Sequence, residues 1–133
     1  MDPKRLREVP LFANLGKREL EQLGRWTTQV QLPEGRVLGR ERSMAYEFFV
    51  IEEGAARVTI DGEHVTDLGA GDFFGEIGLL ERERRTATVT TTTPMRVIVM
   101  LGRDFRAMEH DMPGVAEQIR EAIRERLARR GAP

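Results

Sequence analysis

Apolar residues near the N-terminus recur at roughly helical spacing. The series contains Leu11, Phe12, Leu15, Leu20 and Leu23. This spacing gives a helix one apolar face, so we expect one or two short helices in residues 1–26.

From residue 27 the pattern changes to short apolar runs separated by turns. Val30 and Leu32 alternate with polar neighbours, whereas residues 48–51 form a continuous apolar run. Asp61-Gly62 is typical of a two-residue hairpin turn, and Pro94 precedes a further alternating segment. Many short strands with close turns indicate a closed β-roll, or jelly roll, over residues 27–101.

Helical spacing returns after residue 101. Asp104 is expected to cap a short helix, and a longer helix is expected from about Pro113 to Arg130, where Gly131 ends it. One apolar stripe runs along the longer helix, formed by Val115, Ile119, Ile123 and Leu127. We therefore predict a single domain over residues 1–133, mainly β, with an N-terminal helical segment and C-terminal helices over residues 104–130.

Composition narrows the functional classes. The 133 residues carry a net charge of −1, so no global field attracts nucleic acid or a membrane surface. Cysteine is absent, which excludes disulfides and iron–sulfur clusters. No apolar run approaches the ~20 residues of a membrane span. We expect a cytoplasmic protein with no nucleic-acid partner and no membrane insertion.

The candidate chemistry lies in residues 73–88, a strand end followed by a glycine turn and a charged segment. Gly75 and Gly78 allow the backbone to approach a ligand closely. A short helix beginning there would direct unpaired N–H groups at an anion. Arg85 adds a planar donor fork suited to a phosphate, and Thr86 adds a hydroxyl.

Glu76 sets the kind of ligand. A carboxylate repels phosphate but accepts hydrogen bonds from a pair of ribose hydroxyls. Together with Arg85 it favours a nucleotide with a ribose and a single phosphate, and the chain has no Walker loop for a triphosphate. Residues 81–85 are also consistent with a solvated charged loop, but the joint pattern is much rarer than any one of its parts.

These motifs resemble the cyclic nucleotide-binding domain family. The resemblance rests on Gly69-x-Gly71-Asp72-Phe73-Phe74-Gly75-Glu76, on Arg85-Thr86-Ala87-Thr88 and on Val9-Pro10-Leu11-Phe12, in the order helices, β-roll, short helix, long helix. The family includes catabolite activator-like proteins, cyclic nucleotide-dependent kinases and gated channels. The resemblance implies a sensor domain that binds a cyclic nucleotide and catalyses no reaction.

The family pattern also assigns roles within the cassette, residues 73–88. The carboxylate of Glu76, with the backbone before it, would accept the ribose 2′-hydroxyl. Arg85 would neutralise the cyclic phosphate, helped by Thr86 and by backbone N–H groups near Gly78 and Leu79.

The resemblance further implies a wall and a lid for the base. Val58, Val65 and Leu68 are the expected wall residues of the β-roll. The final helix would cover the base, with Arg120 or Arg124 reaching it. Both arginines are equally consistent with surface ion pairs to glutamates on the same helix.

The sequence indicates the base of the nucleotide and the partner of the domain less directly than it indicates the phosphate site. A hydroxyl at Thr86 is compatible with cyclic GMP, whereas the resemblance to bacterial stand-alone domains favours cyclic AMP. The chain reaches Pro133 soon after the last helix, so a DNA-reading extension is not expected. A movement of the final helix on ligand binding would instead be read by an output protein or through a homodimer on the C-terminal helix.

Three alternative classes could use the same architecture, and the sequence argues against the first two. A cupin-like metal enzyme would need clustered histidines, whereas His64 and His110 stand far apart in the sequence. A haem or iron–sulfur sensor lacks suitable ligands. A degenerate β-roll interaction module would keep the fold without the nucleotide. We expect no metal, no cofactor and no catalytic residue.

Overall fold

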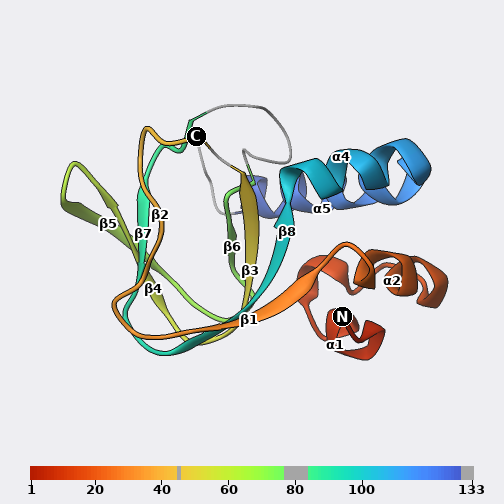
Figure 1. The fold of residues 1–133 in the computed structure, drawn as a ribbon, viewed down its shortest axis with the longest axis horizontal. Helices are drawn as coiled ribbons and strands as arrows, with labels where there is room; N and C mark the ends of the chain where they lie inside the picture. The colour runs from red at the N-terminus through yellow and green to blue at the C-terminus, as the bar shows by residue number, and fades with distance from the viewer. Residues whose placement is uncertain (45, 77–83, 130–133) are drawn as a thin grey trace.

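The computed structural model describes residues 1–44, 46–76 and 84–129 (Figure 1). The N-terminal segment contains α1 (Pro3–Arg7), the 3₁₀ turn η1 (Pro10–Phe12) and α2 (Lys17–Gly24). The strands are β1 (Thr28–Leu32), β2 (Val37–Gly39), β3 (Glu47–Glu53), β4 (Ala56–Ile60), β5 (Glu63–Leu68), β6 (Phe73–Phe74), β7 (Thr88–Thr91) and β8 (Met95–Leu101). The helices α4 (Gly102–Asp111) and α5 (Pro113–Arg129) follow. The predicted β-roll with helices at both ends is confirmed.

Two antiparallel four-stranded sheets form the roll. Sheet A has the order β1-β8-β3-β6, and sheet B has the order β2-β7-β4-β5. In Figure 1 sheet A stands between sheet B and the helices. The roll therefore offers one space between its sheets and another between sheet A and the helices.

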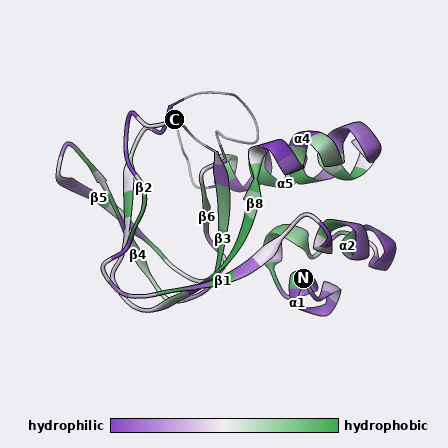
Figure 2. Ribbon diagram, viewed as in Figure 1, coloured by the Kyte–Doolittle hydropathy of each residue, from purple (hydrophilic) through white to green (hydrophobic). Residues whose placement is uncertain are grey.

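Strand β3 is buried on both faces, which explains its continuous apolar run. Phe48 and Val50 pack in the core beneath the helices, whereas Phe49 and Ile51 pack between the sheets. Alternate side chains of a strand point to opposite faces, so a strand in the middle layer needs apolar residues at every position. Figure 2 shows β3, β6 and β8 coloured mostly hydrophobic for this reason.

Two apolar cores result. The helical core joins sheet A to the helices and includes Leu6, Phe12, Leu20, Phe48, Phe73, Met100, Phe105 and Ile119. The inter-sheet core includes Leu32, Phe49, Ile51, Ala56, Phe74, Val89, Met95 and Val97. Phe73 and Phe74 belong to different cores, since they are neighbours in one strand.

The predicted hairpin is confirmed. Strands β4 and β5 are joined by Asp61 and Gly62, both at positive φ (51° and 80°), as a type I′ turn requires. Gly54 also has positive φ, at 100°, where a side chain would meet the carbonyl oxygen of Pro94. That second position requires glycine both for its backbone conformation and for space.

The prediction for the start of α4 was wrong by three residues. The helix follows β8 directly, with Leu101 as N-cap, because the N–H of Gly102 bonds to the carbonyl of Tyr46 at 2.8 Å. Asp104 lies in the first turn instead, where a carboxylate interacts favourably with the helix dipole.

Helix α5 begins at Pro113 as predicted and is described as far as Arg129. The predicted stop at Gly131 lies outside the described residues. Val115, Ile119 and Ile123 are buried in the helical core, so the apolar stripe packs on its own domain.

Candidate functional site

A cavity of about 190 Å³ lies beside the start of the cassette, against sheet B. Six of the predicted ligand residues line it together: Val58, Leu68, Gly75, Glu76, Arg85 and Thr86. Phe73, Phe74, Ala87 and Val89 complete the lining. The cavity thus combines an apolar wall with a carboxylate, a guanidinium and a hydroxyl.

Arg85 is half-buried and packs on bare backbone. A β-carbon added to Gly39 would lie only 2.8 Å from its Cζ and Nε atoms. One added to Gly75 would lie 3.4 Å from its Nη1 atom and would meet the carbonyl oxygen of Glu47. Gly75 also has a φ of 81°. Glycine at both positions leaves the space that the arginine fills.

The electrostatics of Arg85 favour an anionic ligand. Burial lowers its pKa from the ordinary value, and the carboxylates of Glu47 and Glu76 act in the opposite direction. The guanidinium stays protonated, since arginine does not lose its charge in proteins. A partly desolvated cation gains from a further hydrogen-bonded anion.

Two residues of this site were not identified from sequence. Gly39 lies at the end of β2, and Glu47 lies at the start of β3. Neither belongs to a recognisable motif, because each reaches Arg85 through the fold and not through sequence proximity.

Val65 was predicted as a wall residue together with Val58 and Leu68. It does not line the cavity, and 54% of its surface is exposed. Leu68 faces inward, and positions an odd number apart in a strand point to opposite faces. The pairing of β4 with β5 also shifts at this point, between Val58 and Thr59.

The cassette residues Gly78 and Leu79 lie outside the described residues. Thr86 is exposed and borders the cavity next to Arg85. It is therefore accessible to a ligand that the guanidinium binds.

Neither predicted lid arginine lines the cavity. Arg120 forms ion pairs with Glu109 and Glu117 and lies over the Phe105 ring, 5.1 Å from its centroid. Arg124 is exposed, with its Nη1 atom 3.3 Å from Glu121. Both arginines pair with glutamates of their own helix, the alternative that the sequence left open, and Arg120 also pairs with Glu109 of α4.

A different arginine connects α5 to the roll. Arg126 donates from Nη2 to the carbonyl of Gly71 at 3.2 Å. Gly71 belongs to the turn that leads into β6 and the cassette. A larger cavity, about 610 Å³, lies between α5 and the segment around Leu11, away from Arg85.

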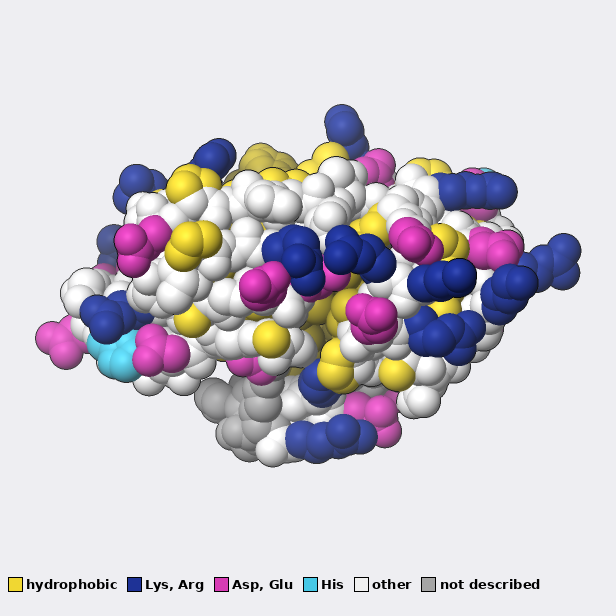
Figure 3. All heavy atoms as spheres, turned by 90° about the horizontal axis from the view of Figure 1, so that it is seen from below, with side chains coloured by type: hydrophobic (Ala, Val, Ile, Leu, Met, Phe, Trp, Pro, Cys, Tyr) yellow, Lys and Arg dark blue, Asp and Glu magenta, His cyan; other side chains and the backbone are white. Residues whose placement is uncertain are grey.

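In the face that Figure 3 shows, cationic and anionic side chains are intermingled. Within residues 1–44, 46–76 and 84–129, no group of three or more His, Asp or Glu side chains is arranged to hold a metal ion. No helix in that same part has the length and apolar character needed to cross a membrane.

The family model of the cyclic nucleotide-binding domain matches residues 29–111. The chain belongs to this family. It is 36% identical over 126 residues to a cyclic nucleotide-gated potassium channel of Rhizobium etli, covering 94% of this chain and 34% of the channel. It is 38% identical over 101 residues to a cAMP-dependent protein kinase regulatory subunit of Yarrowia lipolytica, covering 74% of this chain and 27% of the subunit.

Solved structures share the fold of this chain. A putative cyclic nucleotide-binding protein of Geobacter metallireducens has a TM-score of 0.85 at 23% identity, with 94% of each chain covered. The N-terminal domain of a transcriptional regulator from Streptomyces coelicolor A3(2) has a TM-score of 0.76 at 27% identity, with 94% of this chain and 93% of that chain covered. The chain spans about a third of the length of the potassium channel proteins it matches.

Proposed function

We propose that this domain binds a cyclic nucleotide in the cavity beside Arg85 and acts as a regulatory sensor, not as an enzyme. The observation that carries the proposal is the half-buried Arg85, packed on Gly39 and Gly75, with Glu76 lining the same cavity. A desolvated cation beside a carboxylate matches a ligand that carries one phosphate and ribose hydroxyls.

Each part of the ligand has a partner in this proposal. The guanidinium of Arg85 binds the cyclic phosphate, and Thr86 donates a hydrogen bond to it. Glu76 accepts the ribose 2′-hydroxyl. Val58 and Leu68 pack against the base, since both are half-buried apolar residues on the cavity wall.

Cyclic AMP is the proposed ligand in preference to cyclic GMP. Support comes from the relatives described as regulatory subunits of cAMP-dependent kinases, from three fungi. The channel relatives are described as cyclic nucleotide-gated without a stated base. The exposed Thr86 is compatible with either base.

The proposed signal is a shift of α5. The helix does not line the cavity, so a nucleotide that recruits it would favour a closed state through its additional contacts. Hydrogen exchange over residues 104–129, with and without cyclic AMP, tests this step. Unchanged protection there would rule out a helix lid.

Calorimetric titration of the purified chain with cyclic AMP, cyclic GMP and 5′-AMP tests binding itself. We expect micromolar or tighter binding of cyclic AMP, weaker binding of cyclic GMP and none of 5′-AMP. Before the titration, a separate sample of the protein is unfolded, and the supernatant is assayed for co-purified nucleotide. An empty protein that binds neither cyclic nucleotide would instead be a β-roll interaction module.

The cellular setting is part of the same proposal. We place the domain in the cytoplasm, reporting to an output protein or to a second copy of itself through α5. Size-exclusion chromatography with light scattering, with and without cyclic AMP, separates these two routes.

A further inference from the structure

The backbone of Arg85 is held by a turn on the loop between β2 and β3. The turn spans Arg40–Ser43, closed by the N–H of Ser43 donating to the carbonyl of Arg40 at 3.2 Å. Its third residue, Arg42, has a φ of 71°. Residues other than glycine and asparagine seldom adopt this backbone conformation, so the turn needs support from its surroundings.

The turn forms hydrogen bonds with both the N–H and the carbonyl of Arg85. The N–H of Arg85 donates to the carbonyl of Ser43 at 2.7 Å, and the N–H of Arg42 donates to the carbonyl of Arg85 at 2.8 Å. Arg84 adds a third bond, from Nη1 to the carbonyl of Arg42 at 2.9 Å. The position from which the Arg85 side chain projects therefore depends on this turn.

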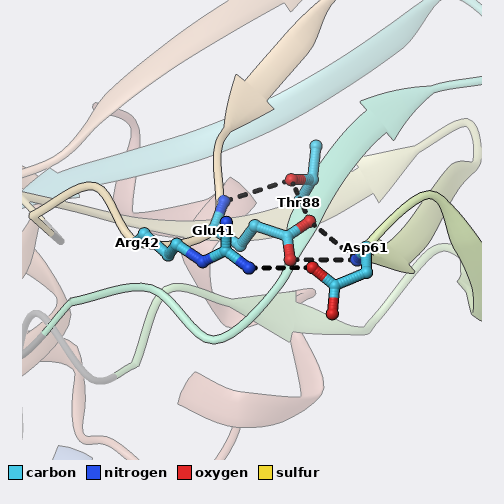
Figure 4. Close-up of polar contacts among 4 residues, drawn as sticks. All are labelled: Glu41, Arg42, Asp61 and Thr88. Atoms are coloured by element: carbon cyan, nitrogen blue, oxygen red, sulfur yellow. Dashed lines mark hydrogen bonds and ion pairs between the residues drawn. The ribbon is translucent and has the colours of Figure 1, made fainter.

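Glu41 joins the turn to strand β7 and to the β4–β5 hairpin turn (Figure 4). Its carboxylate accepts from the Thr88 hydroxyl at 3.0 Å and from the N–H of Asp61 at 3.0 and 3.2 Å. Its own N–H donates to Thr88 Oγ1 at 3.1 Å. Thr88 begins β7, three residues after Arg85, and Asp61 is in the β4–β5 hairpin turn.

The second link between turn and hairpin is weaker. Arg42 Nη2 lies 2.9 Å from Asp61 Oδ1, but these side chains are 79% and 68% exposed. Exposed ion pairs contribute little. Glu41 is only partly exposed, and its bonds are charge-assisted. Glu41 is therefore the main anchor of the turn.

We propose that Glu41 is a positioning residue for the phosphate site. It holds the Arg40–Ser43 turn against β7 and the hairpin. The Arg40–Ser43 turn then holds the backbone of Arg85 beside the cavity. This inference rests on the proposed function, because it assigns the device that presents the phosphate-binding arginine.

The first test is titration of Glu41→Ala, Glu41→Gln and Thr88→Val with cyclic AMP. Removing bonds to a carboxylate is expected to weaken binding roughly tenfold in Glu41→Ala and in Thr88→Val. Glu41→Gln keeps one acceptor oxygen and is expected to recover most of the affinity.

Thr91→Val is the matched control. Thr91 lies on the same strand and fastens a different turn, accepting from the N–H of Arg36 at 2.8 Å and donating to the carbonyl of Pro33 at 2.7 Å. It does not line the cavity. Its loss is expected to lower the melting temperature while cyclic AMP affinity stays within twofold of the unmodified protein.

A double-mutant cycle with Arg85→Ala separates positioning from general damage. If Glu41 acts through Arg85, then Glu41→Ala costs little further affinity once Arg85 is gone. A tenfold loss that persists without Arg85, an unchanged affinity in both Glu41→Ala and Thr88→Val, or an equal loss in Thr91→Val would each overturn the inference. If the unmodified protein does not bind, the proposed function itself fails.

Discussion

Gly39 lies directly against the guanidinium of Arg85. Because a β-carbon at position 39 would come within 2.8–2.9 Å of Cδ, Nε and Cζ, the arginine occupies the space that a side chain would take. A residue of strand β2 thereby shapes the surroundings of an arginine that follows it by 46 residues (85 − 39) in the sequence.

Gly39→Ala is expected to displace Arg85 and weaken cyclic AMP binding by roughly tenfold, an effect in the range of overpacking a tight site. Calorimetric titration measures it. Gly69→Ala is the control, because a β-carbon there meets nothing within 4 Å. Equal affinities in the two variants would mean that the arginine rearranges freely.

Arg85→Ala is expected to weaken cyclic AMP binding by about thirty-fold or more, since removing one partner of a buried charge pair costs roughly 2–5 kcal/mol. Arg57→Ala is the control, because Arg57 is exposed on β4 and does not line the cavity. Unchanged titration of Arg85→Ala would show that the phosphate binds elsewhere.

Thr86→Ala removes a hydroxyl next to the guanidinium. A hydrogen bond to a charged group contributes about 1.5–3 kcal/mol, so the affinity for cyclic AMP is expected to fall about tenfold or more. Titrating the same variant with cyclic GMP shows whether the hydroxyl also selects the base. Wild-type affinity for both nucleotides would exclude Thr86 from the site.

Gly54→Ala is expected to destabilise the fold without touching the cavity. Positive φ and the nearby Pro94 carbonyl together are expected to cost about 2–3 kcal/mol. Gly35→Ala, at a φ of 81° with open space around it, is expected to cost only about 1 kcal/mol. Urea unfolding of both variants measures the difference, and equal midpoints would contradict the steric argument.

Arg126→Ala removes the bond between α5 and Gly71. A hydrogen bond contributes about 1 kcal/mol net, so amides of the last turns of α5 are expected to exchange roughly fivefold faster. Arg124→Ala, on the exposed side of the same helix, is the control. If both variants exchange alike, Arg126 does not hold the helix.

Sequence patterns predicted local elements well, because their causes are local. Asp61-Gly62 specifies a type I′ hairpin by its φ requirements, and the alternation of residues 95–101 matches β8. The start of α4 was missed because it depends on a bond from Gly102 to Tyr46, a contact between separate elements.

The same division holds for the site. Glu76 and Arg85 were predicted together because one motif contains both, and they line one cavity. Gly39 and Glu47 reach Arg85 only through folding, so no spacing signals them. Arg120 has Glu109 on the preceding helix as a partner, a pairing that no single-helix pattern contains.

The middle layer of the fold lies between the cavity beside Arg85 and the helices. Phe73 and Phe74 both border the cavity, yet one packs in the helical core and the other between the sheets. A single thickness of backbone thus separates the cavity from the helical core. The proposed signal would therefore need no long relay of side chains, and we expect substitutions in β6 to alter ligand affinity and helix packing together.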